Sequence, residues 1–185
     1  MSTLATHQTT VSTWNIDPAH SVAEFKIKHM MISNVKGQFT RVTGVLFRDE
    51  SDVTNSRVEA SIDAASISTG DAQRDEHLKG AEFFDAEKFP TLSFKSTKVT
   101  RSPGGELTAA GALTIHGVTR NVEFTVEGPS EPAKDPWGKT RLGLSATTKI
   151  SRKDFGLTWN AALETGGILL GDDITITLEV QFVKA

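Results

Sequence analysis

The chain has 185 residues, 37% of them hydrophobic and 23% charged, with a formal net charge of −3 and no cysteines. This composition is typical of one soluble globular domain, and without a basic cluster it excludes the electrostatic footprint of a nucleic-acid-binding protein. Disulfides are excluded, and no apolar run approaches the roughly 18 residues of a membrane-spanning helix.

The first dozen residues, MSTLATHQTTVS, are rich in Ser and Thr. They have neither the basic start nor the apolar core of a signal peptide. We therefore expect a disordered tail over residues 1–12 and a single domain over residues 13–185. As given, the chain is expected in the cytoplasm, and in the periplasm or outside the cell if a signal has been removed.

Alternating apolar and polar residues predict strands over residues 14–16, 22–29, 35–47 and 58–63. The third strand is long, and Gly44 is expected to mark a bulge or bend in it. The predicted inward positions are Ala23, Phe25, Ile27 and His29, then Val35, Gly37, Phe39, Val45 and Phe47, then Val58, Ala60 and Ile62.

Residues 69–80, TGDAQRDEHLKG, form the clearest helix candidate. Thr69 or Asp71 can cap the start of the helix, and Gly80 can close it. Because this segment has little apolar stripe, we expect it to lie outside the core or across one end of it. The loop that follows contains three Phe residues, which must be buried.

The stretch from Leu107 to Glu127 predicts a hairpin with a two-residue turn at His116-Gly117, two residues that tolerate positive φ. This register places Gly111 opposite Val122, and Leu113 opposite Arg120. One face is apolar except for Arg120, and Gly111 is expected to leave space above it.

Further strands are predicted near residues 92–101, 142–150 and 174–182. The last has a regular apolar face, and we expect it to pair with an N-terminal strand, either 14–16 or 23–29. About eight amphipathic strands with one short helix predict an all-β fold, either a closed antiparallel barrel or a sandwich. A barrel of about eight strands can hold one small ligand.

Several long segments carry a family resemblance. They are WNIDPAHS at 14–21, VKGQFTRVTG at 35–44, IDAASISTGDAQRDEHLKGAEFFDAEKFPTLSFKST at 62–97, LTIHGVTRNVEF at 113–124 and KISRKDFGLTWNAALETGGILLGDDITITLEV at 149–180. The sequence resembles the YceI-like, polyisoprenoid-binding family. The resemblance implies a single antiparallel eight-stranded lipocalin-like barrel, an interior that holds a long isoprenoid or similar lipid, and often a homodimer.

On this basis we predict a set of ligand-binding residues on the inward faces of the strands and in the segment before the last strand. They are Phe25, Ile27, His29, Phe39, Leu92, Phe94, Gly111, Val122, Phe124, Leu142, Leu144, Trp159, Ile176 and Leu178. The competing interpretation is a filled hydrophobic core. Small residues such as Gly37, Gly111, Gly143 and Ala146 favour a cavity.

Candidates for catalysis or metal binding are weak. None of the five histidines has the spacing of a zinc motif, and no nucleophile or nucleotide fingerprint is present. His20 and His29 are the strongest histidine candidates, whereas His77 is interpreted as part of a solvated helix face. Arg120 is expected either to extend out of a barrel end or to meet an acidic group, for which Asp154 is one candidate. We therefore predict no catalytic residue, no metal and no cofactor.

The leading hypothesis is a non-enzymatic protein that stores or transports a polyisoprenoid or an isoprenoid quinone. A fatty acid or fatty amide is the alternative ligand of the same class. A competing class is an enzyme acting on an isoprenoid lipid, and a third is an interaction barrel with a filled core.

Overall fold

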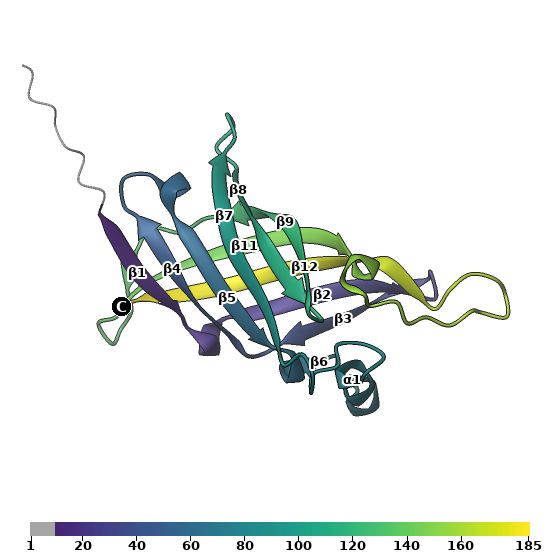
Figure 1. Ribbon diagram of the computed structural model, residues 1–185. Coiled ribbons are helices and arrows are strands. Elements are labelled where there is room, and N and C mark those ends of the chain that lie inside the picture. The colour runs from purple at the N-terminus through teal and green to yellow at the C-terminus, as the bar shows by residue number, and fades with distance from the viewer. Residues whose placement is uncertain (1–9) are drawn as a thin grey trace, which may run out of the picture.

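In the computed structural model, which describes residues 10–185, twelve strands form one antiparallel sheet that closes on itself (Figure 1). The strands are β1 (Val11–Ile16), β2 (Val22–His29), β3 (Ser33–Phe39), β4 (Val42–Asp49), β5 (Arg57–Asp63), β6 (Ile67–Ser68), β7 (Thr91–Arg101), β8 (Leu107–Ile115), β9 (Val118–Glu127), β10 (Ala133–Lys134), β11 (Thr140–Ser151) and β12 (Leu170–Lys184). The described helices are α1 (Ala72–Lys79) and the short 3-10 turns η1 (Pro18–His20), η2 (Val53–Asn55), η3 (Ala64–Ser66) and η4 (Arg152–Phe155).

Eleven of the twelve strands occupy eight positions around the barrel, because three positions are each shared by two strands; the remaining strand, β10, pairs with β11 outside the ring. β1 and β2 lie along the same edge of β12, β4 and β3 pair with them, and β5 and β6 pair with β4 and β3. β7, β8, β9 and β11 follow, and the pairing of β11 with β12 closes the ring. The predicted closed antiparallel barrel is confirmed, and the sandwich alternative is wrong.

The two ends of the barrel differ. We call the end with the start of β1, the β7–β8 turn and the C-terminus the terminal end. The opposite end has the β2–β3 turn, α1, the β8–β9 turn and the loop over residues 156–169, and we call it the helix end (Figure 1). No helix in the described part of the chain is long and apolar enough to cross a membrane.

The predicted central hairpin is confirmed in register and turn. Gly111 lies opposite Val122, and Leu113 lies opposite Arg120. His116 and Gly117 have φ angles of 54° and 71°, so both turn residues are left-handed, as a type I′ hairpin turn requires. The register follows from this local turn because a two-residue loop fixes which residues face each other.

The last strand closes the barrel against the N-terminal part of the chain. β12 pairs with β1 through Phe182 and Lys184, and with β2 through residues 170–179. The predicted pairing is therefore confirmed for both candidate strands. Phe182 is only 1% exposed, so this closure also supplies a central part of the core.

Two predicted boundaries are corrected. The single strand predicted over residues 35–47 is interrupted at Thr40 and Arg41, where β3 ends and β4 begins. The interruption reverses the alternation, so Leu46 faces the core, while Phe47 lies outside under the Arg57 guanidinium at 4.3 Å. Residues 1–9 of the predicted tail (1–12) lie outside the described part of the chain. The prediction is wrong for residues 11 and 12, because β1 already begins at Val11.

The predicted helix is present with shorter bounds. Asp71 caps α1 by accepting a hydrogen bond from the Arg74 backbone N–H at 2.9 Å, and the Gly80 N–H closes the other end on the His77 carbonyl. Thr69 lies before the helix, where its N–H and hydroxyl donate to Asp75. α1 packs beside β6 at the helix end, outside the ring of strands (Figure 1).

Candidate ligand cavity

A cavity of about 370 Å³ occupies the interior of the barrel. This volume lies within the range of roughly 300–1,000 Å³ that is usual for small-molecule sites. Its middle is apolar, with side chains from all sides of the ring, and its wall extends to Arg48 at the terminal end and to Arg74 and His77 at the helix end. Such a shape suits an elongated apolar molecule with room for polar groups at either end.

Eleven of the fourteen predicted ligand-binding residues lie on the cavity wall. They are Phe25, Ile27, His29, Phe39, Leu92, Phe94, Phe124, Leu144, Trp159, Ile176 and Leu178. Ten of them are presented inward by their strands through the period-2 alternation that the sequence displays, and Trp159 lies on the loop before β12. Whether they bind a ligand stays a prediction.

The other three, Gly111, Val122 and Leu142, do not line the cavity. A Cβ on Gly111 would lie 2.8 Å from the Phe94 ring and 2.3 Å from the Lys95 carbonyl oxygen. Phe94 in turn packs edge-on against Phe124, with ring centroids 5.1 Å apart. The space predicted above Gly111 is therefore filled by Phe94, and the correction is that the cavity lies beyond this aromatic pair.

The helix end of the cavity carries an aromatic cluster of His77, Phe83 and Trp159. The Trp159 ring lies 5.2 Å from the rings of both His77 and Phe83, and His77 lies edge-on to both neighbours. The His77 Nε2 atom pairs with Glu82 at 2.6 Å. His77 is exposed, as its interpretation as part of a solvated helix face predicts, and its ring also belongs to the cavity wall. The polar neighbours Asp75 and Glu76 conceal this role in the sequence.

Arg152 is a buried cation of the barrel wall, with 2% of its surface exposed. Its guanidinium donates to the carbonyl oxygens of Leu157, Trp159 and Gly171 at 2.7, 2.8 and 2.8 Å. Burial lowers the pKa of Arg152, and the nearby Asp172 carboxylate partly opposes this. The arrangement anchors the base of the loop that carries Trp159. The sequence offers no signal for it, since Arg152-Lys153 resembles an ordinary exposed pair.

The remaining polar candidates lie away from the cavity. The Arg120 side chain is exposed, which agrees with the expectation that it extends outward rather than meeting an acidic group. Asp154, the candidate acidic partner, is exposed as well. His116 packs in its turn against Phe89 at 4.9 Å, and His7 lies outside the described residues. Across residues 10–185, no three His, Cys, Asp or Glu side chains gather as a metal site would require.

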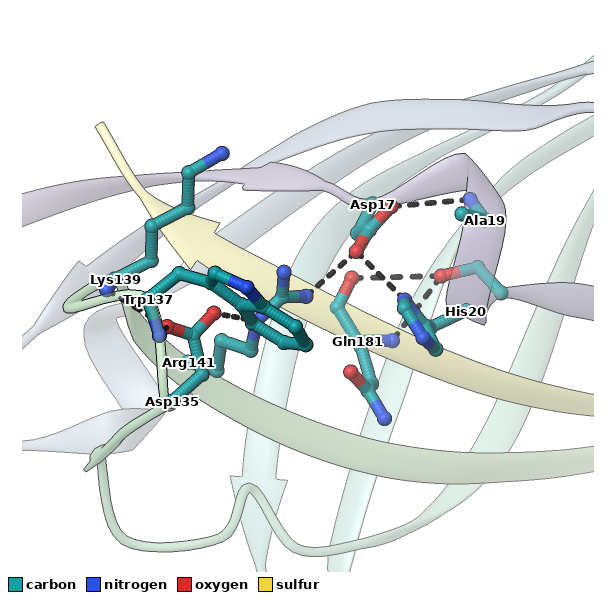
Figure 2. Close-up of polar contacts among 9 residues, drawn as sticks. Asp17, Ala19, His20, Asp135, Trp137, Lys139, Arg141 and Gln181 are labelled. Carbon is teal, nitrogen blue, oxygen red and sulfur yellow. Dashed lines mark hydrogen bonds and ion pairs between the residues drawn. The ribbon is translucent and has the colours of Figure 1, made fainter.

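A network of charges lies on the outer face near the terminal end (Figure 2). Arg141 on β11 donates from Nη1 to Asp17 at 2.5 Å and from Nε to Asp135 at 2.7 Å, and His20 pairs with Asp17 at 2.9 Å. The hydrogen bond from Arg141, followed by that from His20, lowers the pKa of Asp17 to about 2. Arg141 likewise lowers the pKa of Asp135. The network joins the β1–β2 bend to the 129–139 loop, so its role is to hold these two segments together.

Comparisons with known proteins agree with the fold. A family model described as the YceI-like domain matches residues 14–182. A UPF0312 protein of Staphylococcus aureus is 36% identical over 174 residues, which are 93% of this chain and 98% of that protein. A Campylobacter jejuni YCEI protein superposes with a TM-score of 0.72 at 32% identity, covering 86% of this chain and 91% of that one. A polyisoprenoid binding domain from Saccharophagus degradans superposes with a TM-score of 0.67 at 13% identity, covering 95% of this chain and 100% of that one.

Proposed function

Because the chain belongs to the YceI-like domain family, we propose that it binds, stores or carries a long apolar lipid inside its barrel and does so without catalysis. The observation that carries the proposal is the apolar cavity through the centre of a closed barrel. Transfer of an apolar chain from water into such a cavity is favourable by about 25 cal/mol per Å² of apolar surface buried. A polyisoprenoid or an isoprenoid quinone is the proposed ligand, and the polyisoprenoid binding described for the Saccharophagus degradans domain supports this choice.

Catalysis on such a lipid would require a base or nucleophile beside the bound chain. His29 and His77 are the imidazoles on the cavity wall in the described part of the chain, and His77 already pairs with Glu82. Turnover of an added quinone that disappears in His29→Gln would overturn the non-enzymatic proposal. The homodimer and the cytoplasmic location expected from the sequence stay predictions, which sedimentation and cell fractionation can check.

The proposal is tested by native mass spectrometry of the mildly purified protein, followed by organic extraction. We expect a bound mass that extracts as an isoprenoid lipid; extraction of a fatty acid or amide would instead support the alternative ligand. A folded protein that carries no lipid and takes up none would contradict the proposal.

A pair of variants on β11 locates the ligand. Ala146 lies on the cavity wall, and the next residue, Thr147, is exposed on the outer face. Ala146→Phe should fill cavity space and lower the lipid capacity, whereas Thr147→Phe should leave it unchanged. Equal lipid capacity in both variants would place the ligand outside the barrel.

A further inference from the structure

The β2–β3 turn at the helix end exposes three consecutive apolar residues. Met30, Met31 and Ile32 are 41%, 58% and 78% exposed. Ile168, which is 37% exposed, lies in the neighbouring loop, and the Met30 N–H donates to the Leu169 carbonyl at 2.7 Å. Both segments extend beyond the barrel on the same side (Figure 1). Grouped apolar exposure of this kind marks an interaction surface.

The backbone of the turn does not require these residues. Met30 and Met31 have φ angles of 52° and 60°, a left-handed conformation that favours Gly, Asn or Asp. Two methionines therefore occupy positions where small polar residues fit better. Strain of this kind at an exposed site points to a function for the side chains.

Three lysines lie behind this tip on the outer face of the hairpin. Lys26 pairs directly across from Lys36, and Lys28 lies closer to the turn. Like charges directly opposite each other destabilise a sheet. In the described part of the chain none of the three forms an ion pair, while the acidic residues of the adjoining strand, Asp172 and Asp173, pair with Lys153 and Lys149 at 3.2 Å each. The sequence shows no basic cluster here because the hairpin is what brings Lys36 beside Lys26.

We propose that the β2–β3 turn docks the barrel on an anionic lipid bilayer. The apolar tip enters the headgroup region, and the lysines face the anionic headgroups. At ~3.3 Å per residue, Lys28 lies ~7 Å and Lys26 ~13 Å behind Met30. An interfacial segment enters the bilayer by about 5–10 Å, so this spacing places lysine ammonium groups near the headgroup level.

The occupant is a bilayer rather than a second copy of the chain. A symmetric contact between two tips would bring two unpaired lysine clusters toward each other, whereas anionic headgroups neutralise them. The tip also continues directly from the cavity wall, since His29, Leu169 and Leu170 line the cavity. The inference rests on the proposed lipid-carrying function and names the membrane as the source or destination of the lipid.

The test is flotation of the full chain with large unilamellar vesicles of phosphatidylcholine, with and without 30% phosphatidylglycerol. We expect binding to the anionic vesicles that is lost at high salt, because screening shortens the range of the lysine charges. Lys26→Gln with Lys36→Gln should weaken this binding about 30-fold. Met31→Gln with Ile32→Gln should weaken it by about tenfold or more.

Matched controls lie at the terminal end. Lys134→Gln with Lys139→Gln changes the net charge equally, and Trp137→Gln removes an apolar residue that is 81% exposed. Both should bind vesicles as the unmodified protein does. Vesicle binding that is equal in the tip and control variants would overturn the inference, as would a dimer, detected by sedimentation, that only the tip variants abolish.

A second measurement separates this inference from the proposed function. Uptake of diphenylhexatriene from dilute solution reports on the cavity and requires no vesicle. The tip variants should take up this probe normally. If the unmodified protein takes up the probe and does not bind vesicles, only the docking inference fails; if it binds vesicles and takes up no apolar probe, the lipid-carrying function fails.

Discussion

Two tryptophans at opposite ends of the barrel have different surroundings. Trp14, at the terminal end, is 1% exposed, donates from Nε1 to the Ser12 hydroxyl at 2.7 Å and belongs to the hydrophobic core. Trp159, at the helix end, is half-buried on a loop and lies on the cavity wall. The difference indicates that Trp14 contributes mainly to the stability of the barrel, whereas Trp159 lies where it can contact a ligand.

The largest effect is expected at the terminal end. Trp14→Ala should lower the free energy of unfolding by about 3–5 kcal/mol, because it removes a fully buried ring and leaves a cavity in the core. Urea unfolding measures this loss, and Trp14→Phe should recover part of it. A loss below about 1 kcal/mol would contradict the assignment of Trp14 to the core.

Two glycines on the barrel wall give the next effect. Gly111→Ala places a Cβ 2.3 Å from the Lys95 carbonyl oxygen, whereas Gly143→Ala meets its nearest atom, the Val180 carbonyl oxygen, at 3.6 Å. Backbone must move only in the first case, so Gly111→Ala should cost roughly 1–3 kcal/mol and Gly143→Ala should be near neutral. Thermal unfolding of both variants checks this, and equal melting temperatures would show that the wall at Gly111 is not filled.

At the helix end, Trp159→Ala is expected to change stability less, and ligand binding more, than Trp14→Ala does at the terminal end. Trp159→Ala should cost about 1–2 kcal/mol, since only part of the ring is removed from water. The same change should alter the affinity for diphenylhexatriene, because the ring forms part of the cavity wall. Ile168→Ala in the same loop is the control. If Trp159→Ala destabilises as strongly as Trp14→Ala, the contrast between the two ends is wrong.

The sequence predicts what depends on near neighbours. The Leu107–Glu127 hairpin has the predicted register because its two-residue turn fixes the register locally. The inward positions of β12 follow from uninterrupted alternation in the same way. The family resemblance supports the closed form of the barrel.

What the sequence does not predict depends on contacts between distant segments. The break between β3 and β4 at Thr40 has no Gly or Pro signal, and Ser66, from another strand connection, accepts the hydrogen bond of the Arg41 N–H. The filled space above Gly111 depends on the side chain of Phe94 from the next strand. The burial of Arg152 likewise depends on carbonyl groups up to 19 residues away. Tertiary packing decides all three.

The smallest effect concerns the charge network of the terminal end and appears only in acid. Because Arg141 and His20 hold the pKa of Asp17 at about 2, below its usual 3.8, the folded state keeps this carboxylate ionised more readily than the unfolded state does. Its contribution to stability is therefore fully present above pH 4 and is lost as the pH falls from about 4 toward 2.

Arg141→Met removes the largest cause of the shift, so the pKa of Asp17 returns toward 3.8 and the loss of stability with falling pH becomes shallower. The urea midpoint, followed from pH 7 to pH 2, measures this slope. Arg120→Met is the control, since within residues 10–185 the exposed Arg120 forms no ion pair and donates one hydrogen bond, to the Thr119 carbonyl at 3.4 Å. A slope in Arg141→Met as steep as in Arg120→Met would mean that the network does not couple stability to pH, and the terminal end would then depend on its buried core alone.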